Sequence, residues 1–247
     1  MKWSNWLFVA IMLLLMAVFI ALGFWQVERL GEKQALIAAV EERYTSEPVA
    51  FPPAQDWASL DPADLIFQPV EITGQYLPGQ SVRIFTSLAS TTARGAASGP
   101  GYWVVTPFAL QQGGTVFVNR GFVPDALIDD YMTAESLPAG EVTIEGVLRA
   151  PEAASLFTPE PDPERRLAWV RDPGQLAALA EDDLSPIAPM TLDLAAGPEG
   201  TLPQGGETVI EFPNNHLGYA MTWFGFALIT PFLLGAWLWR QRKTSNA

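Results

Sequence analysis

The chain has 247 residues, a net charge of −13 at neutral pH and no cysteine. Without a thiol, disulfide bonds, thiolate metal sites and cysteine nucleophiles are excluded. The charge is uneven, because residues 26–215 contain all 27 acidic residues but only ten of the 14 basic ones, which gives this stretch a net charge of −17. Such a domain repels nucleic acid and anionic lipid headgroups.

Residues 6–25 form an unbroken run of twenty uncharged residues. At a rise of 1.5 Å per helical residue, this run matches a hydrocarbon core about 30 Å thick and predicts a transmembrane helix. A cleavable signal peptide would have an apolar region of only about 7 to 15 residues and a cleavage site of small residues. Here the bulky residues Phe24 and Trp25 end the run. We therefore predict an uncleaved anchor, preceded by residues 1–5.

Residues 26–215 predict one domain that is rich in short strands. Good helix formers continue from Val27 to about Arg43, so the first helix should extend beyond the membrane. Gly113-Gly114 lies between two alternating runs and predicts a hairpin turn. Strands are expected at 67–76, 81–86, 102–108, 115–119 and 142–148, a short helix at 173–181, and a loop rich in proline and glycine at 185–206. Five or more such strands indicate an antiparallel barrel or sandwich.

A second apolar segment, residues 216–239, predicts another transmembrane helix, which Pro231 should kink. Basic residues follow at once, and by the positive-inside rule they hold the tail at 240–247 in the cytoplasm. These residues are Arg240, Arg242 and Lys243, and Lys2 has the same effect at the N-terminus. The predicted fold class is an α+β membrane protein, in which two transmembrane helices flank one antiparallel β-rich extracytoplasmic domain.

His216 is the only histidine, and it stands where the second apolar segment begins. The positive end of a helix dipole and partial burial in lipid both disfavour imidazolium, so we expect a neutral imidazole that can coordinate a metal. One histidine cannot build a zinc or non-haem iron site, but it is sufficient as the axial ligand of a haem. The alternative is an interfacial histidine that is hydrogen-bonded to a loop within a belt of aromatic residues.

Helical spacing places Tyr219, Ala220, Trp223 and Ala227 on the same face as His216, where they would form an apolar wall. Gly218, Thr222, Gly225 and Ile229 form an adjacent stripe that would let another helix approach closely.

Arg29 and Lys33 follow the outer end of the first apolar segment, on the same side of the membrane as His216. They could pair with haem propionates, or they could be solvated or paired with nearby acids. Arg120, at the end of a predicted strand, is another candidate for such a contact. The alternative is that it only braces a turn. No nucleophile elbow or phosphate-binding loop is found, and a hydrolase has little support.

The sequence resembles the surfeit-locus family of cytochrome oxidase assembly proteins, the relatives of the mitochondrial Shy proteins. The resemblance covers nearly the whole chain and depends on the order and spacing of several short motifs. These are LGFWQVER at 22–29, GQY at 74–76, GYWVVTPF at 101–108, VNRGFVP at 118–124, GVLR at 146–149 and NNHLGYAMTWF at 214–224. Phe122 stands where the family has tryptophan, a mild departure.

The resemblance implies an assembly factor for haem-copper oxidases that is not an enzyme and that helps to insert haem a into cytochrome c oxidase subunit I. It implies that His216 is the iron ligand, packed by Tyr219 and Trp223, in the bacterial plasma membrane. Gln26, Arg29 and Lys33 are predicted to contact the propionates or a partner. The main alternative is a scaffold without cofactor that holds oxidase subunits or haem A synthase together. A two-span sensor is disfavoured, because few residues follow Arg240.

Overall fold

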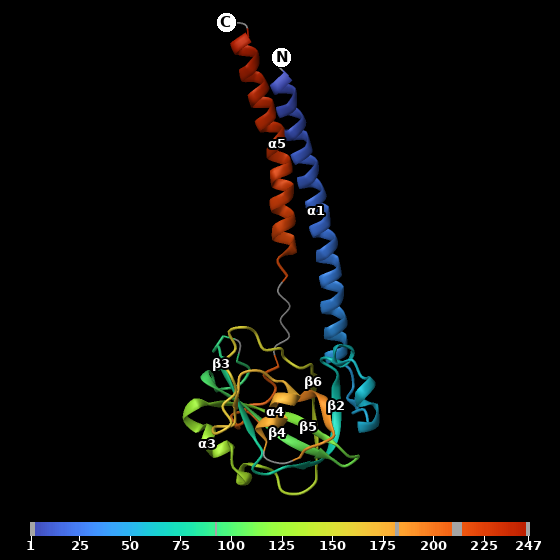
Figure 1. The fold of residues 1–247 in the computed structure, drawn as a ribbon, viewed down its shortest axis with the longest axis vertical. Helices are drawn as coiled ribbons and strands as arrows, with labels where there is room; N and C mark the ends of the chain where they lie inside the picture. The colour runs from blue at the N-terminus through green and yellow to red at the C-terminus, as the bar shows by residue number, and fades with distance from the viewer. Residues whose placement is uncertain (1–2, 92, 181–182, 209–213, 246–247) are drawn as a thin grey trace. The chain divides into compact units, whose positions relative to one another are not determined.

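The computed structural model describes residues 3–91, 93–180, 183–208 and 214–245. It divides into two compact units (Figure 1). One consists of residues 1–41 together with 210–247, and the other consists of residues 42–209.

Two long helices make up the first unit. Helix α1 spans Trp3–Tyr44 and helix α5 spans His216–Ser245, which continues through Pro231 as one element. They lie side by side in opposite directions (Figure 1), with the ring centroids of Phe8 and Trp237 4.6 Å apart. By length and composition each is able to cross a membrane. Their apolar windows are only 6% and 11% buried, whereas the core helix of a soluble protein would be mostly buried.

The second unit contains the strands and several short helices. The strands are β1 Val49–Ala50, β2 Pro69–Tyr76, β3 Val82–Leu88, β4 Gly99–Leu110, β5 Thr115–Pro124, β6 Val142–Arg149, β7 Leu167–Ala168 and β8 Ile187–Leu194. The α-helices are α2 Pro62–Leu65, α3 Ile128–Tyr131 and α4 Pro173–Leu179, and three 3-10 turns lie at Ala54–Ser59, Asp125–Leu127 and Ala134–Ser136.

Five strands close into a barrel, because the pairing order β2-β6-β8-β5-β4 returns from β4 to β2. Gly74 makes this closure possible. It pairs with Leu110, and a Cβ atom added to Gly74 would lie only 2.0 Å from the backbone oxygen of Ala109. Any larger residue would therefore force the two closing strands apart. Strands β3 and β7 extend the sheet beyond β4, and β1 pairs with β2.

Alternate residues of the barrel strands fill its interior, as the period of two along a strand requires. The largest core cluster includes Val70, Ile72, Phe108, Leu148 and Met190. A second cluster contains Phe117 with Leu176 and Leu179 of α4, so this short helix contributes to a core of its own. Asp172 caps α4, accepting a hydrogen bond from the backbone N–H of Gln175.

The five predicted strands, the hairpin at Gly113-Gly114 and the helix near 173–181 are confirmed. The predicted extension of the first helix is also confirmed, because α1 continues to Tyr44. Two expectations were wrong. The segment 185–206 is not only a loop, since it contains β8, and the barrel is not purely antiparallel, since β8 runs parallel to β5.

Candidate functional site

The first residue of α5 is the only histidine of the chain, and the two residues before it arrange the start of the helix. The Asn215 carbonyl accepts the first backbone hydrogen bond, from the N–H of Tyr219 at 3.2 Å. The side-chain oxygen of Asn214 lies 3.4 Å from the backbone nitrogen of His216 and takes up one of the N–H groups that a helix start leaves unpaired. The backbone around His216 is therefore held by its own sequence.

A buried glutamine of α1 holds the imidazole ring of His216. The Gln26 side chain is 8% exposed, and its Oε1 atom lies 2.7 Å from Nδ1 of His216. An amide oxygen accepts hydrogen bonds, so this contact fits the tautomer of His216 that carries its proton on Nδ1. In that tautomer the lone pair is on Nε2, and a ring nitrogen with a lone pair is the atom through which histidine binds a metal.

Close packing between α1 and α5 surrounds this hydrogen bond. A Cβ atom added to Gly23 would lie 2.6 Å from the ring of Phe224, so a larger residue there would force this ring to shift. Next to it, the rings of Phe24 and Phe224 meet edge to face at 5.4 Å. Gly23 thus lets the ring of Phe224 lie close against α1 within one turn of Gln26.

The face predicted as a wall for a haem is the face that packs against α1. Ala220 and Ala227 are buried, and the ring of Trp223 stacks on Phe19 with a centroid distance of 5.8 Å. Tyr219, by contrast, is 57% exposed. The structure therefore brings Gln26 together with His216 and uses Trp223 to join the two helices.

The remaining predicted residues lie on α1. Arg29 forms an ion pair with Glu32, one turn along the helix, and the side chains of both are about half exposed. Lys33 lies one turn beyond Arg29.

On α5, Gly218 and Gly225 have open space around them, so the predicted small-residue stripe is not where α1 approaches.

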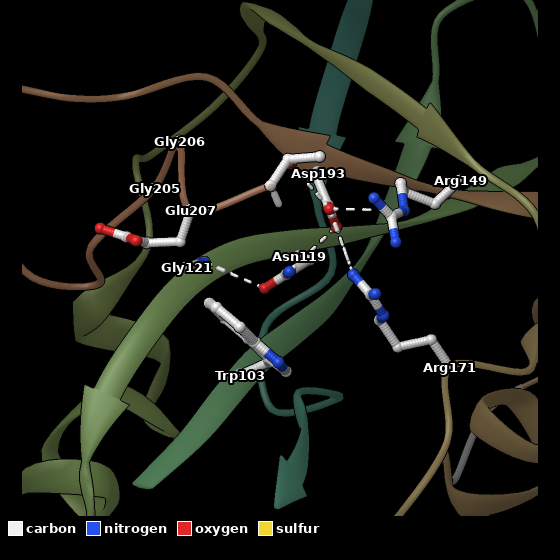
Figure 2. Close-up of a pocket in the computed structure, with 10 residues that line it drawn as sticks. Trp103, Asn119, Gly121, Arg149, Arg171, Asp193, Gly205, Gly206 and Glu207 are labelled. Atoms are coloured by element: carbon white, nitrogen blue, oxygen red, sulfur yellow. Dashed lines mark hydrogen bonds and ion pairs between the residues drawn. The ribbon is translucent and has the colours of Figure 1, made fainter. Parts of the chain in front are cut away.

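The barrel contains a buried polar cluster that the sequence analysis did not identify (Figure 2). Asp193 of β8 lies at its centre and accepts hydrogen bonds from Arg171 at 2.9 and 3.1 Å, from Asn119 at 3.0 Å and from Thr208 at 2.9 Å. Arg149 of β6 lies 3.8 Å from the same carboxylate. These residues line a cavity of about 130 Å³ beside Trp103.

Charges in this cluster are largely paired within the barrel. Burial acts to lower the pKa of Arg171, but Asp193 and Glu152 outweigh it and raise that pKa above its ordinary value. Burial lowers the pKa of Arg149 despite the opposing effect of Asp193. We interpret the cluster as a brace that ties β5, β6 and β8 together. Asn119 and Arg149 occur in the motifs that carry the family resemblance. Their place in those motifs was the one signal in the sequence that could have pointed to this cluster.

Arg120 braces a turn, which was one of the two roles predicted for it. Its guanidinium donates to the side chain and backbone oxygens of Ser136 and to the backbone oxygen of Tyr131. It also lies 6.0 Å from the ring centre of Tyr76. Burial raises the pKa of Tyr76 to about 12, partly opposed by Arg120. Arg120 is thus an internal support of the barrel.

Comparison with known proteins places these features in a family. A model of the SURF1 family matches residues 13–228, which include both Gln26 and His216. The chain belongs to the SURF1 family. It is 33% identical to a SURF1-like protein of Monosiga brevicollis, over 91% of this chain and 84% of that protein. It is 32% identical to Surfeit locus protein 1 of Homo sapiens, over 90% of this chain and 75% of that protein. A SURF1-like protein of Drosophila melanogaster is 31% identical over 90% of this chain and 74% of that protein.

The SURF1 match covers the whole barrel, most of α1 and the first part of α5, which includes His216. Within the described residues, no group of three or more histidine, cysteine, aspartate or glutamate side chains is placed to hold a metal ion. His216 is the one imidazole that the chain supplies.

Proposed function

We propose that this chain is a membrane-anchored assembly factor for haem-copper oxidase, which binds haem a through His216 and passes it to subunit I of the oxidase. The observation that supports this most is the 2.7 Å contact between Nδ1 of His216 and Oε1 of Gln26, which fits the tautomer with its lone pair on Nε2. The oxidase role itself comes from the family resemblance and applies to this chain as part of the proposal.

The donor set fits a haem better than a bare metal ion. A haem brings four nitrogen ligands and needs only an axial imidazole from the protein. The described residues supply no cluster of carboxylates or imidazoles for a bare ion. When bound, the haem would supply the iron and the porphyrin, and the chain would supply one neutral ligand with a fixed tautomer. A haem held by one imidazole of the chain would be released more readily than a haem held by two, which suits a carrier.

Other side chains near the helix start could complete the site. Tyr219 is exposed and lies within one turn of His216, so it is our candidate for a contact with the porphyrin. The ion pair of Arg29 with Glu32 is exposed, and such pairs contribute only about 0–1 kcal/mol. Arg29 can therefore exchange its partner for a propionate at little cost. We propose the same role for Lys33.

We propose that both helices lie in the bacterial plasma membrane with the barrel on the periplasmic side. Their apolar side chains point outward along most of their length, as lipid contact requires. Arg240 and Arg242 lie in the last turns of α5, after its apolar stretch, and favour a cytoplasmic tail. In this arrangement the chain is a carrier rather than an enzyme, and haem A synthase is the candidate donor of the haem.

A complementation experiment separates this proposal from a scaffold without cofactor. In a strain that lacks the gene, His216→Ala should insert normally into the membrane but leave the oxidase with at most about a tenth of its haem a. Met221→Ala is the matched control, because Met221 is 69% exposed on the same helix. The readout is the haem a absorbance of isolated oxidase. If His216→Ala restores the oxidase as fully as the control does, the scaffold is correct and the carrier is wrong.

A further inference from the structure

We propose that Gln26 is a positioning residue that sets both the tautomer and the ligand strength of His216, and so makes the haem site releasable. The effect of Gln26 on ligand strength and haem release rests on the proposed function. Its effect on the tautomer of His216 concerns the haem-free protein alone. The two residues lie 190 positions apart in the sequence, so only the pairing of α1 with α5 brings them together.

The hydrogen bond is placed so that the ring has little freedom. Gln26 is buried, and its oxygen lies at a short 2.7 Å from Nδ1. Three residues before it, Gly23 allows the ring of Phe224 to lie close against α1. On the other side, the backbone of His216 is held by Asn214. The acceptor and the ring are thus each attached to a rigid element.

Neutral imidazole exchanges between two tautomers, and the acceptor at one nitrogen decides which tautomer dominates. With the oxygen of Gln26 facing Nδ1, the Nδ1–H form is selected and Nε2 becomes the ligand. Removing the acceptor should return the ring to exchange between both forms.

The chemistry of the acceptor also controls how strongly the imidazole binds a metal. Metal-bound histidines commonly donate their second N–H to a carboxylate, a carbonyl or water, which orients the ring and raises its basicity. A carboxylate raises the basicity of the ring most, because its negative charge attracts the Nδ1–H proton and leaves more electron density on Nε2. Here the acceptor is a neutral amide. The ring is therefore oriented as well as in a permanent site, but it remains a weaker donor, as a carrier requires.

The tautomer of His216 can be measured directly, because a chain with a single labelled histidine gives one set of ring signals. The full chain, carrying a tag without histidine, is labelled with ¹⁵N-histidine, and ring nitrogen shifts are recorded without haem at a pH where the ring is neutral. The wild type should show the Nδ1–H tautomer, and Gln26→Leu should show a mixture with substantial Nε2–H. Gln34→Leu is the matched control, since Gln34 is an exposed glutamine on the same helix. A protonated Nε2 in the wild type, or a Gln26→Leu spectrum like that of the wild type, would overturn the proposal.

The effect of Gln26 on the ligand strength of His216 is tested by the rate of haem release. Purified protein loaded with haem a is mixed with excess apomyoglobin, and the transfer rate is followed by absorbance. Gln26→Glu should slow the release by about tenfold or more, within the range typical of partners that orient a metal ligand. Equal release rates for Gln26→Glu and the wild type would refute the role in ligand strength. If the wild type binds no haem a at all, the proposed function fails, but the tautomer result still stands.

Discussion

Replacing Asp193 with alanine should lower the free energy of unfolding of the barrel by about 3–5 kcal/mol. The carboxylate is nearly buried and receives hydrogen bonds from Arg171, Asn119 and Thr208. Its loss leaves the part-buried guanidinium of Arg149 without the carboxylate at 3.8 Å, and it leaves Arg171 with Glu152, whose side chain is 41% exposed. The cost of an uncompensated buried charge is much larger than the cost of a lost hydrogen bond between neutral groups.

Thermal unfolding of the full chain in detergent, followed by tryptophan fluorescence, measures this effect. For a domain of this size, Asp193→Ala should lower the Tm by roughly 10 °C. Asp129→Ala is the matched control, because Asp129 forms an ion pair with Arg83 at 2.9 Å but its side chain is 86% exposed. An exposed pair contributes at most about 1 kcal/mol. A Tm loss for Asp193→Ala no greater than that of Asp129→Ala would show that the cluster is not a brace.

The second large effect is expected at Gly23. Substitution to isoleucine places a branched side chain where even a Cβ atom would lie 2.6 Å from the ring of Phe224. Overpacking of this kind typically costs about 1–3 kcal/mol. The helices should move apart, and the hydrogen bond between Gln26 and His216, one turn away, should lengthen and break.

Gly31→Ile is the control for this substitution, because Gly31 lies on the same helix and a Cβ atom added there would have no neighbouring atom within 4 Å. The ¹⁵N spectrum of the single histidine reports the result without any haem. Gly23→Ile should shift His216 toward a tautomer mixture, and Gly31→Ile should leave it unchanged. If both variants keep the wild-type tautomer, the close approach at Gly23 does not hold the site together.

Much of the barrel was predictable because its strands carry strong local signals. Alternating and β-branched runs gave β2 to β6, and Gly113-Gly114 gave the hairpin between β4 and β5. The pairing that closes the barrel was not predictable, because it depends on the approach of β2 to the far end of β4. Nothing in the local sequence of either strand identifies that partner.

Strand β8 was missed for a physical reason. Its segment contains Pro189, and proline is normally confined to edge strands or bulges because it lacks a backbone N–H. In the structure, the register between β8 and β5 shifts between Thr115 and Phe117, which are paired with Ile187 and Thr191. Pro189 lies within this irregular stretch, while the regular pairing with β6 begins at Thr191. Composition alone could not show that the proline falls where no ladder bond is needed.

The sequence identified His216 but not its surroundings. Helical spacing correctly placed Trp223 and the two buried alanines on the face of His216, yet it could not show whether that face meets a cofactor or another helix. In the structure the ring of Trp223 packs on Phe19 of α1, and its predicted contact with a cofactor stays a prediction. Gln26 was selected as a contact for the cofactor or a partner. Its pairing with His216 depends on the meeting of two helices 190 residues apart, which no local pattern encodes.

The most direct test of the carrier is the absorbance spectrum of the full-length protein purified from cells that synthesise haem A. The wild type should carry haem a, and His216→Ala should lose most of the haem a absorbance while its barrel retains the wild-type Tm. Because the imidazole is the only one in the chain, no other histidine can replace it. A colourless wild type, or a His216→Ala variant with an unchanged haem a spectrum, would contradict the carrier function.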